Sequence, residues 1–328
     1  MSFWKSRRVL VTGGNGFIGS HLVELLLAEG ATVTSTASSE ESRYRYLEHL
    51  RDDVRTVVGD LADPSRARAA THGQQIVLHL AARVGGIAYN IRHPGSIFQR
   101  NMNVFMAVLD AARESAVDRF LVTSSACVYP RFCTIPTPEA EGFKDTPEPT
   151  NEGYGWAKRM EEFLGQAYAT EYGMEVRIAR PYNAYGPRDN FDPASSHVIP
   201  AIIHRLTGGE NPLVIWGDGS ATRSFLYATD FARGLMAVAE RSPQVAAINI
   251  GSTEEISMRT LAETLVRLSG RQVELRFDAT KPAGQPRRVC DTRLAEELVG
   301  FRALVPMEEG LLRTLVWYEQ QMAVGQKR

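Results

Sequence analysis

A glycine-rich loop near the N-terminus constrains the fold of this chain more strongly than any other sequence feature. The apolar residues 9–11 lead into Gly13-Gly14-Asn15-Gly16-Phe17-Ile18-Gly19, and an apolar stripe typical of a helix follows over 20–29. Glycines at 13, 16 and 19 allow a tight turn, a close approach of the backbone to a phosphate, and close packing of helix on strand. The sequence therefore predicts a strand–loop–helix unit whose helix N-terminus binds phosphate.

Short apolar segments alternate with longer helical patterns through the first half of the chain. Strands are predicted at 32–35, 54–58, 76–80, 120–123 and 176–179, and long helices at 101–113 and 154–172. This alternation predicts an α/β fold with a doubly wound parallel sheet covered on both faces. With the glycine-rich loop, it indicates a Rossmann domain that binds a dinucleotide. The loop residues expected to contact the dinucleotide are Gly13, Asn15, Gly16, Phe17, Ile18 and Gly19.

The pattern changes after residue 186, where prolines and glycines divide the chain into shorter pieces. We expect a smaller C-terminal α/β domain here, lying over the ends of the strands and binding the substrate. Its predicted segments are 187–224 and 251–328. The Rossmann domain would then comprise 1–186 and a return segment near 225–250.

The charge balance narrows the range of partners. The 328 residues include 37 Lys and Arg against 38 Asp and Glu, for a formal net charge of −1. No basic excess is available to neutralise nucleic acid or an anionic membrane, so neither is an expected partner. The three cysteines form no CxxC pair and the seven histidines show no metal-ligand spacing, so no metal is expected. A cytoplasmic protein is the simplest interpretation.

Two segments bear on which dinucleotide is bound. Asp60 and Leu61 follow the predicted strand 54–58. The Asp60 carboxylate could accept a hydrogen bond from the adenine amino group or cap the next helix. At the end of the second strand, Ala37 stands where an acidic residue would hold the ribose 2′-hydroxyl. Ser38 and Arg43 suit a 2′-phosphate better, which favours NADP over NAD. A small shift of the alignment would instead bring Glu40 to the ribose.

Tyr154 and Lys158 are one helical turn apart and so share one face of the predicted helix. A free tyrosine has a pKa of about 10, and a neighbouring lysine cation would lower it. The pair could then exchange a proton with a sugar hydroxyl or ketone. Ser125, at the end of the strand 120–123, could share the same substrate oxygen.

The glycine-rich loop, Ser125, Tyr154 and Lys158 together resemble the extended short-chain dehydrogenase/reductases that act on nucleotide sugars. The resemblance covers nearly the whole chain. The segments that resemble GDP-L-fucose synthases specifically are 79–87, 124–130, 149–152, 186–191 and 196–200. GDP-mannose 3,5-epimerases are the next most similar family, through the segments 124–130 and 216–219. The resemblance implies 3,5-epimerisation and 4-reduction of a GDP-4-keto-6-deoxyhexose. Asn15, where fucose synthases typically carry an arginine, and the longer segment 36–60 depart from the pattern.

The resemblance also implies roles for further residues. Cys127 would be the base and His197 the acid of the epimerisation, and an extended backbone would point Ser125 and Cys127 to the same side. The remaining cofactor contacts would be Leu80, Ala81, Ala82, Asn101, Tyr154, Lys158, Pro181 and Asn183, with a helix N-cap as the alternative for Asn101. The nucleotide-diphosphate sugar would contact Val84, Gly85, Arg205, Trp216, Arg223 and Arg288. A homodimer would form through the helices 101–113 and 154–172.

Two other functions remain open from the sequence. One is a redox-neutral epimerase with tightly bound NAD, similar to GDP-mannose 3,5-epimerases or UDP-sugar 4-epimerases. The other is a non-catalytic nucleotide-sensing protein, which the intact Ser125, Tyr154 and Lys158 set disfavours. A dehydratase is disfavoured because Ala126 and Cys127 replace its Asp-Glu pair.

Overall fold

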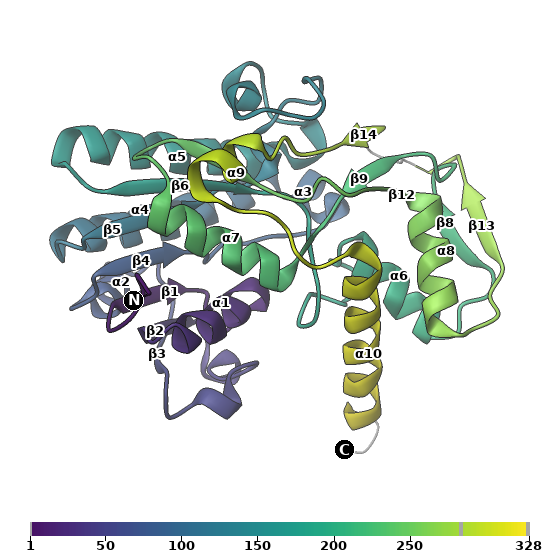
Figure 1. Ribbon diagram of the computed structural model, residues 1–328, viewed down its shortest axis with the longest axis horizontal. Helices are drawn as coiled ribbons and strands as arrows, with labels where there is room; N and C mark the ends of the chain where they lie inside the picture. The colour runs from purple at the N-terminus through teal and green to yellow at the C-terminus, as the bar shows by residue number, and fades with distance from the viewer. Residues whose placement is uncertain (1, 282–284, 326–328) are drawn as a thin grey trace.

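The computed structural model describes residues 2–281 and 285–325 and is built around a parallel sheet of seven strands (Figure 1). Every pairing in this sheet is parallel. Its order is β11 (Ala247–Ile250), β6 (Val176–Pro181), β5 (Arg119–Thr123), β4 (Ile76–His79), β1 (Arg8–Thr12), β2 (Thr32–Ala37) and β3 (Arg55–Val58). The chain order reverses between β1 and β4, and this switch point is where sheets of this kind bind ligands, at the carboxyl ends of the strands.

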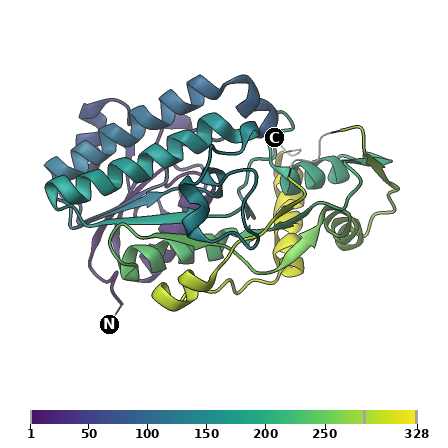
Figure 2. The same ribbon diagram turned by 90° about the horizontal axis from the view of Figure 1, so that it is seen from above.

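Helices cover both faces of the sheet (Figure 2). One face carries α1 (Phe17–Ala28), α7 (Ala228–Arg241) and α9 (Arg293–Val299), and the other carries α2 (Pro64–Thr71), α4 (Pro94–Glu114) and α5 (Glu152–Tyr172). Strand β1 shows why both faces are buried. Val9 and Val11 point into the core beneath α1 and α7, whereas Leu10 points into the core beneath α4.

The rest of the chain forms a smaller group of elements, on the right in Figure 1. Three small sheets pair β7 (Ala184–Tyr185) with β10 (Leu226–Tyr227), β8 (Leu213–Trp216) with β13 (Leu275–Asp278), and β9 (Thr222–Ser224) with β12 (Glu255–Ser257) and β14 (Arg287–Arg288). Three helices, α6 (Val198–Thr207), α8 (Met258–Ser269) and α10 (Met307–Gly325), enclose a separate apolar core. The short helix α3 (Ile87–Arg92) precedes α4.

The predicted elements are present, with three differences. Helix α4 begins at Pro94 rather than at 101, because proline is well suited to the first turn of a helix. The backbone after β5 forms a 3-10 turn over Ala126–Val128 rather than an extended strand. Val299 and Phe301 belong to the core of the large sheet, although we assigned 251–328 to the smaller domain. No helix in the described residues is long and apolar enough to span a bilayer.

Candidate active site

The glycine-rich loop provides a cradle for a dinucleotide phosphate. Gly13 has φ +68°, a conformation that favours glycine, and a Cβ on Gly19 would overlap the carbonyl oxygen of Gly13. Helix α1 starts after Gly16 without a side-chain cap, so the backbone N–H groups of Phe17 and Ile18 remain available to a phosphate. The loop therefore fits the pyrophosphate of NAD or NADP, and a larger residue at position 19 would disrupt it.

Asn15 fixes this loop to the segment after β2. Its amide oxygen accepts from the Ser35 hydroxyl, and its amide nitrogen donates to the carbonyl of Ser42 at 3.3 Å. Arg43 forms an exposed ion pair with Glu40 at 3.2 Å. A 2′-phosphate near the exposed Ser38 would compete with Glu40 for this guanidinium, a modest cost because exposed ion pairs are weak.

Asp60 lies next to the buried Leu61 and is held by Arg100 of α4 through two contacts of 2.6 and 2.8 Å. The hydrogen bonds from Arg100 hold the pKa of Asp60 below its usual range. The N-cap alternative for Asp60 is wrong. Helix α2 is capped by Asp63, which accepts from the backbone N–H of Ser65 at 2.8 Å.

The end of β4 lies directly beside the glycine-rich loop. The backbone N–H groups of Leu80 and Ala81 both donate to the Thr12 hydroxyl at 3.0 Å, and the half-buried Ala82 follows them. The buried Asn101 then clamps the backbone of Arg83, accepting from its N–H at 2.6 Å and donating to its carbonyl at 3.1 Å. Asn101 lies inside α4, so it is not an N-cap, and it shapes the segment that leads to Val84 and Gly85.

Ser125, Tyr154 and Lys158 come together at the carboxyl end of β5. The Ser125 hydroxyl hydrogen-bonds Tyr154 and also accepts from the backbone N–H of Cys127 at 3.1 Å. The Lys158 ammonium lies 5.6 Å from the centre of the Tyr154 ring. It donates to the carbonyl of Thr123 at 3.0 Å and to the carboxylate of Glu161 at 2.7 Å. The tyrosine and lysine thus face the end of β5 from one side of α5.

Burial raises the pKa of Tyr154 well above its usual value, and the neighbouring Cys127 and Glu161 add to the rise. The hydrogen bond with Ser125 opposes it. Our expectation that Lys158 would bring this pKa down is therefore wrong, because desolvation of the phenol dominates. A tyrosine that stays protonated at neutral pH is suited to donate a proton.

Cys127 is half-buried in the 3-10 turn that follows Ser125. The extended backbone that we expected between these two residues is absent, because Ser125 caps the turn. Arg288 of β14 reaches over this turn, where it hydrogen-bonds the Cys127 side chain and donates to the carbonyl of Ala126. The thiol therefore lies between the tyrosine and a cation.

His197 immediately precedes α6, and part of the residue is accessible to solvent although protein atoms surround its imidazole. Desolvation by the protein around it lowers the pKa of its imidazole. The chain just before it packs against the segment after β4, since a Cβ on Gly86 would lie 3.2 Å from the carbonyl oxygen of Ser196. The backbone just before His197 therefore lies close to the segment that carries Val84 and Gly85.

Two arginines are paired in register on neighbouring strands of the small sheet. Arg223 of β9 lies opposite Arg288 of β14. Burial, with a smaller contribution from Arg288, lowers the pKa of Arg223 to about 10, while Glu148 opposes the change. Two adjacent guanidinium groups suit a ligand with two negative charges, and a diphosphate has this chemistry.

The remaining residues expected to bind substrate or cofactor differ in how far their side chains are already engaged by the protein. Arg205 is engaged by Glu210 at 2.7 Å and by the carbonyl of Val214 at 2.7 Å, so a diphosphate would have to displace an ion pair there. Trp216 ends β8 with 57% of its surface exposed, and it is free to stack on a base. Asn183 follows the buried Pro181 and donates to the carbonyl of Ser224 at 3.0 Å, joining β6 to β9.

Sequence reasoning missed Glu161 and Glu148. Glu161 contacts the ammonium of Lys158. Glu148 is a buried carboxylate whose charge raises the pKa of both Arg223 and Arg288. The three-residue spacing from Lys158 to Glu161 places both on one helix face, and that signal was available. Glu148 had no such signal, since the two arginines whose pKa it affects come from distant segments.

A Rossmann sheet with a serine, tyrosine and lysine at its carboxyl edge defines a short-chain dehydrogenase/reductase of the extended type. The model of the NAD dependent epimerase/dehydratase family matches residues 9–251, and the chain belongs to this family of NAD(P)-dependent nucleotide-sugar epimerases and reductases.

Relatives and solved structures support the same assignment. The chain is 33% identical to a probable GDP-L-fucose synthase 1 of Oryza sativa, over 98% of this chain and 95% of that one. It is 32% identical to a dTDP-4-dehydro-6-deoxy-D-allose reductase of Streptomyces bikiniensis, over 96% and 97%. The structure of UDP-glucose 4-epimerase from Thermotoga maritima matches with a TM-score of 0.84 and 26% identity, covering 96% of this chain and 99% of the other.

Proposed function

We propose that the protein epimerises a GDP-4-keto-6-deoxyhexose at C3 and C5 and then reduces it at C4, with NADP as the preferred cofactor. The observation that carries the proposal is the grouping of Cys127 with Ser125 and Tyr154 at the end of β5. This grouping places a thiol beside the two hydroxyl groups that would hold a ketone. The relatives named GDP-L-fucose synthase support this substrate class.

In the proposed reaction, Ser125 and Tyr154 hydrogen-bond the C4 oxygen of the sugar. Cys127 removes a proton from the carbon beside the ketone, and His197 supplies one from the opposite side of the ring. The lowered pKa of His197 favours the neutral imidazole, so the negative charge of a bound diphosphate would be needed to favour its protonated form. A bound reduced nicotinamide would supply hydride to C4, and Tyr154 would protonate the oxygen.

The variant Cys127→Ser tests the epimerisation. A serine hydroxyl is a much weaker base than a thiolate, so incorporation of solvent deuterium at C3 and C5 should fall by about 100-fold or more. NADPH binding should remain, because Cys127 is not part of the glycine-rich loop. Deuterium content is measured by NMR of the sugar product and NADPH affinity by fluorescence. Incorporation at the wild-type rate would remove Cys127 from the scheme.

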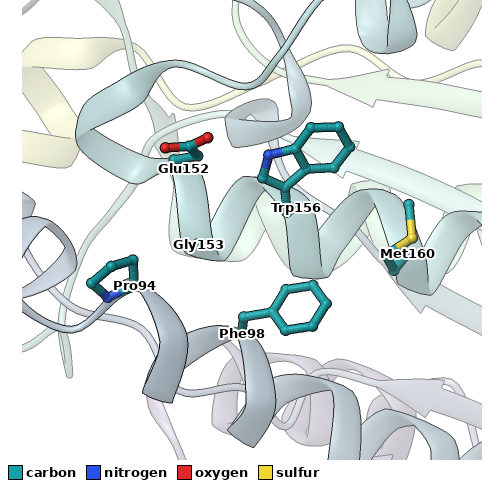
Figure 3. Close-up of a pocket in the computed structure, with 6 residues that line it drawn as sticks. All are labelled: Pro94, Phe98, Glu152, Gly153, Trp156 and Met160. Atoms are coloured by element: carbon teal, nitrogen blue, oxygen red, sulfur yellow. The ribbon is translucent and has the colours of Figure 1, made fainter.

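We further propose a homodimer formed through α4 and α5. Their outer face carries an apolar hollow between Pro94 and Phe98 of α4 and Trp156 and Met160 of α5 (Figure 3). The exposed Phe163, with 56% of its surface accessible, extends this face along α5. Apolar surface of this extent on neighbouring helices is typical of an interface between copies.

Phe163→Glu should convert this dimer to a monomer, because it places a charge in the apolar interface. Light scattering with size exclusion measures the mass. Leu304→Glu provides the control, since Leu304 is 67% exposed and its backbone N–H donates to Asp230 of α7, on the opposite face of the sheet from α4 and α5. A wild-type protein that is monomeric at micromolar concentration contradicts the proposal.

A further inference from the structure

Glu161 is a buried carboxylate that contacts the lysine of the active site. It lies on α5, three residues after Lys158, and its side chain is 1% exposed, against 3% for Lys158. Its Oε2 atom lies 2.7 Å from the Lys158 Nζ atom. Burying a carboxylate is costly unless it is paired. Burial raises the pKa of Glu161, and the charge of Lys158 is the largest effect that opposes this rise.

The Lys158 ammonium has three N–H donors. One is used by the carbonyl of Thr123 at 3.0 Å and a second by Glu161. A single N–H donor of Lys158 therefore remains for a cofactor hydroxyl or for the Tyr154 hydroxyl. Glu161 and Thr123 together fix the direction of this donor, and the negative charge of Glu161 offsets the charge of the ammonium next to Tyr154.

We propose that Glu161 is a positioning residue that orients Lys158 and sets the pH at which the Tyr154–Lys158 pair releases its first proton. A negative charge beside the pair favours the fully protonated state of both groups, whichever of them loses its proton first. Glu161 thereby extends to higher pH the range in which Tyr154 can act as an acid. This inference rests on the proposed role of Tyr154 as the proton donor.

Other titratable groups face the same region. Cys127, in the turn after β5, contributes to the raised pKa of Tyr154. The charge of Lys158 contributes to the lowered pKa of His79 in β4. Glu162 adds to the rise in the pKa of Glu161, but its own charge is countered by Arg180 of β6 at 2.7 Å. Glu161 is thus the carboxylate that directly contacts the ammonium, and it also raises the pKa of Tyr154.

The variant Glu161→Gln separates charge from shape. Glutamine keeps an oxygen that accepts from Lys158 but removes the negative charge. The high-pH limb of kcat/KM should then move about one pH unit lower. Glu171→Gln, the same change at an exposed position of α5, should leave the limb in place. A purely structural role would leave the limb unmoved in Glu161→Gln, and that result would overturn the proposal.

A second readout does not depend on turnover. In protein labelled with 13C at the tyrosine Cζ, the Tyr154 resonance is the one lost in Tyr154→Phe, and its titration midpoint should fall stepwise from wild type to Glu161→Asp to Glu161→Gln. Aspartate keeps the negative charge but draws it away from Lys158, so it gives the intermediate value. An unchanged midpoint in both variants overturns the inference. A shifted midpoint in a protein that reduces no GDP-ketosugar would refute only the proposed function.

Discussion

Tyr154→Phe is expected to lower kcat for ketosugar reduction by about 10³- to 10⁴-fold, the upper range for loss of a general acid. Burial keeps the Tyr154 phenol protonated, and phenylalanine removes this proton without changing the ring. Lys158 and Ser125 remain, but neither places a proton at the position of the phenol hydroxyl. Single-turnover consumption of NADPH, followed by absorbance, measures the effect on the chemical step.

Tyr168→Phe is the matched control, because Tyr168 lies on the same helix and donates its hydroxyl proton to Asp110. This variant should retain kcat within about twofold. If Tyr154→Phe keeps more than a tenth of wild-type kcat, another group donates the proton, and Ser125 becomes the candidate. NADPH binding should be similar in all three proteins.

Glu162→Ala is expected to lower the free energy of unfolding by about 3–5 kcal/mol, because it leaves a buried guanidinium without its counter-ion. Glu162 and Arg180 are 0% and 4% exposed, and two hydrogen bonds of 2.8 and 2.7 Å join them. Glu162 also accepts from the hydroxyl of Ser124, the residue before Ser125. Urea unfolding followed by circular dichroism measures the loss.

Glu171→Ala serves as the control, since it makes the same substitution at an exposed position of the same helix. It should change the stability by less than about 0.5 kcal/mol. Equal unfolding free energies for the two variants would show that Arg180 finds other partners. The Tyr129 hydroxyl at 3.2 Å and the carbonyl of Glu139 at 2.7 Å are the groups that would serve.

The fold could be predicted from the sequence because local patterns specify it. The glycine-rich loop and the alternating apolar segments gave strands β1 to β6 within a few residues, and the later return to the sheet is made by α7 and β11. The element boundaries that were predicted wrongly depend on competition between local interactions. Helix α4 extends back to Pro94, and β5 gives way to a turn because the Ser125 hydroxyl accepts from the N–H of Cys127.

The site could be predicted only in part, because its energetics depend on distant segments. The helical spacing of Tyr154 and Lys158 follows from α5 alone. The contact of Arg288 with the turn at Ala126 joins positions 162 residues apart, and no local pattern indicates it. Burial of the phenol likewise requires the packed structure, so the direction of the Tyr154 pKa shift was predicted with the wrong sign.

The most direct test of the proposed function is to mix the wild-type protein with NADPH and GDP-4-keto-6-deoxymannose and to follow the absorbance of the reduced nicotinamide. We expect rapid loss of absorbance and a 6-deoxy-galacto product, with solvent deuterium at C3 and C5 when the reaction is run in deuterated water. Unchanged absorbance with this ketosugar would contradict the account. Deuterium exchange without NADPH consumption would then indicate a redox-neutral epimerase.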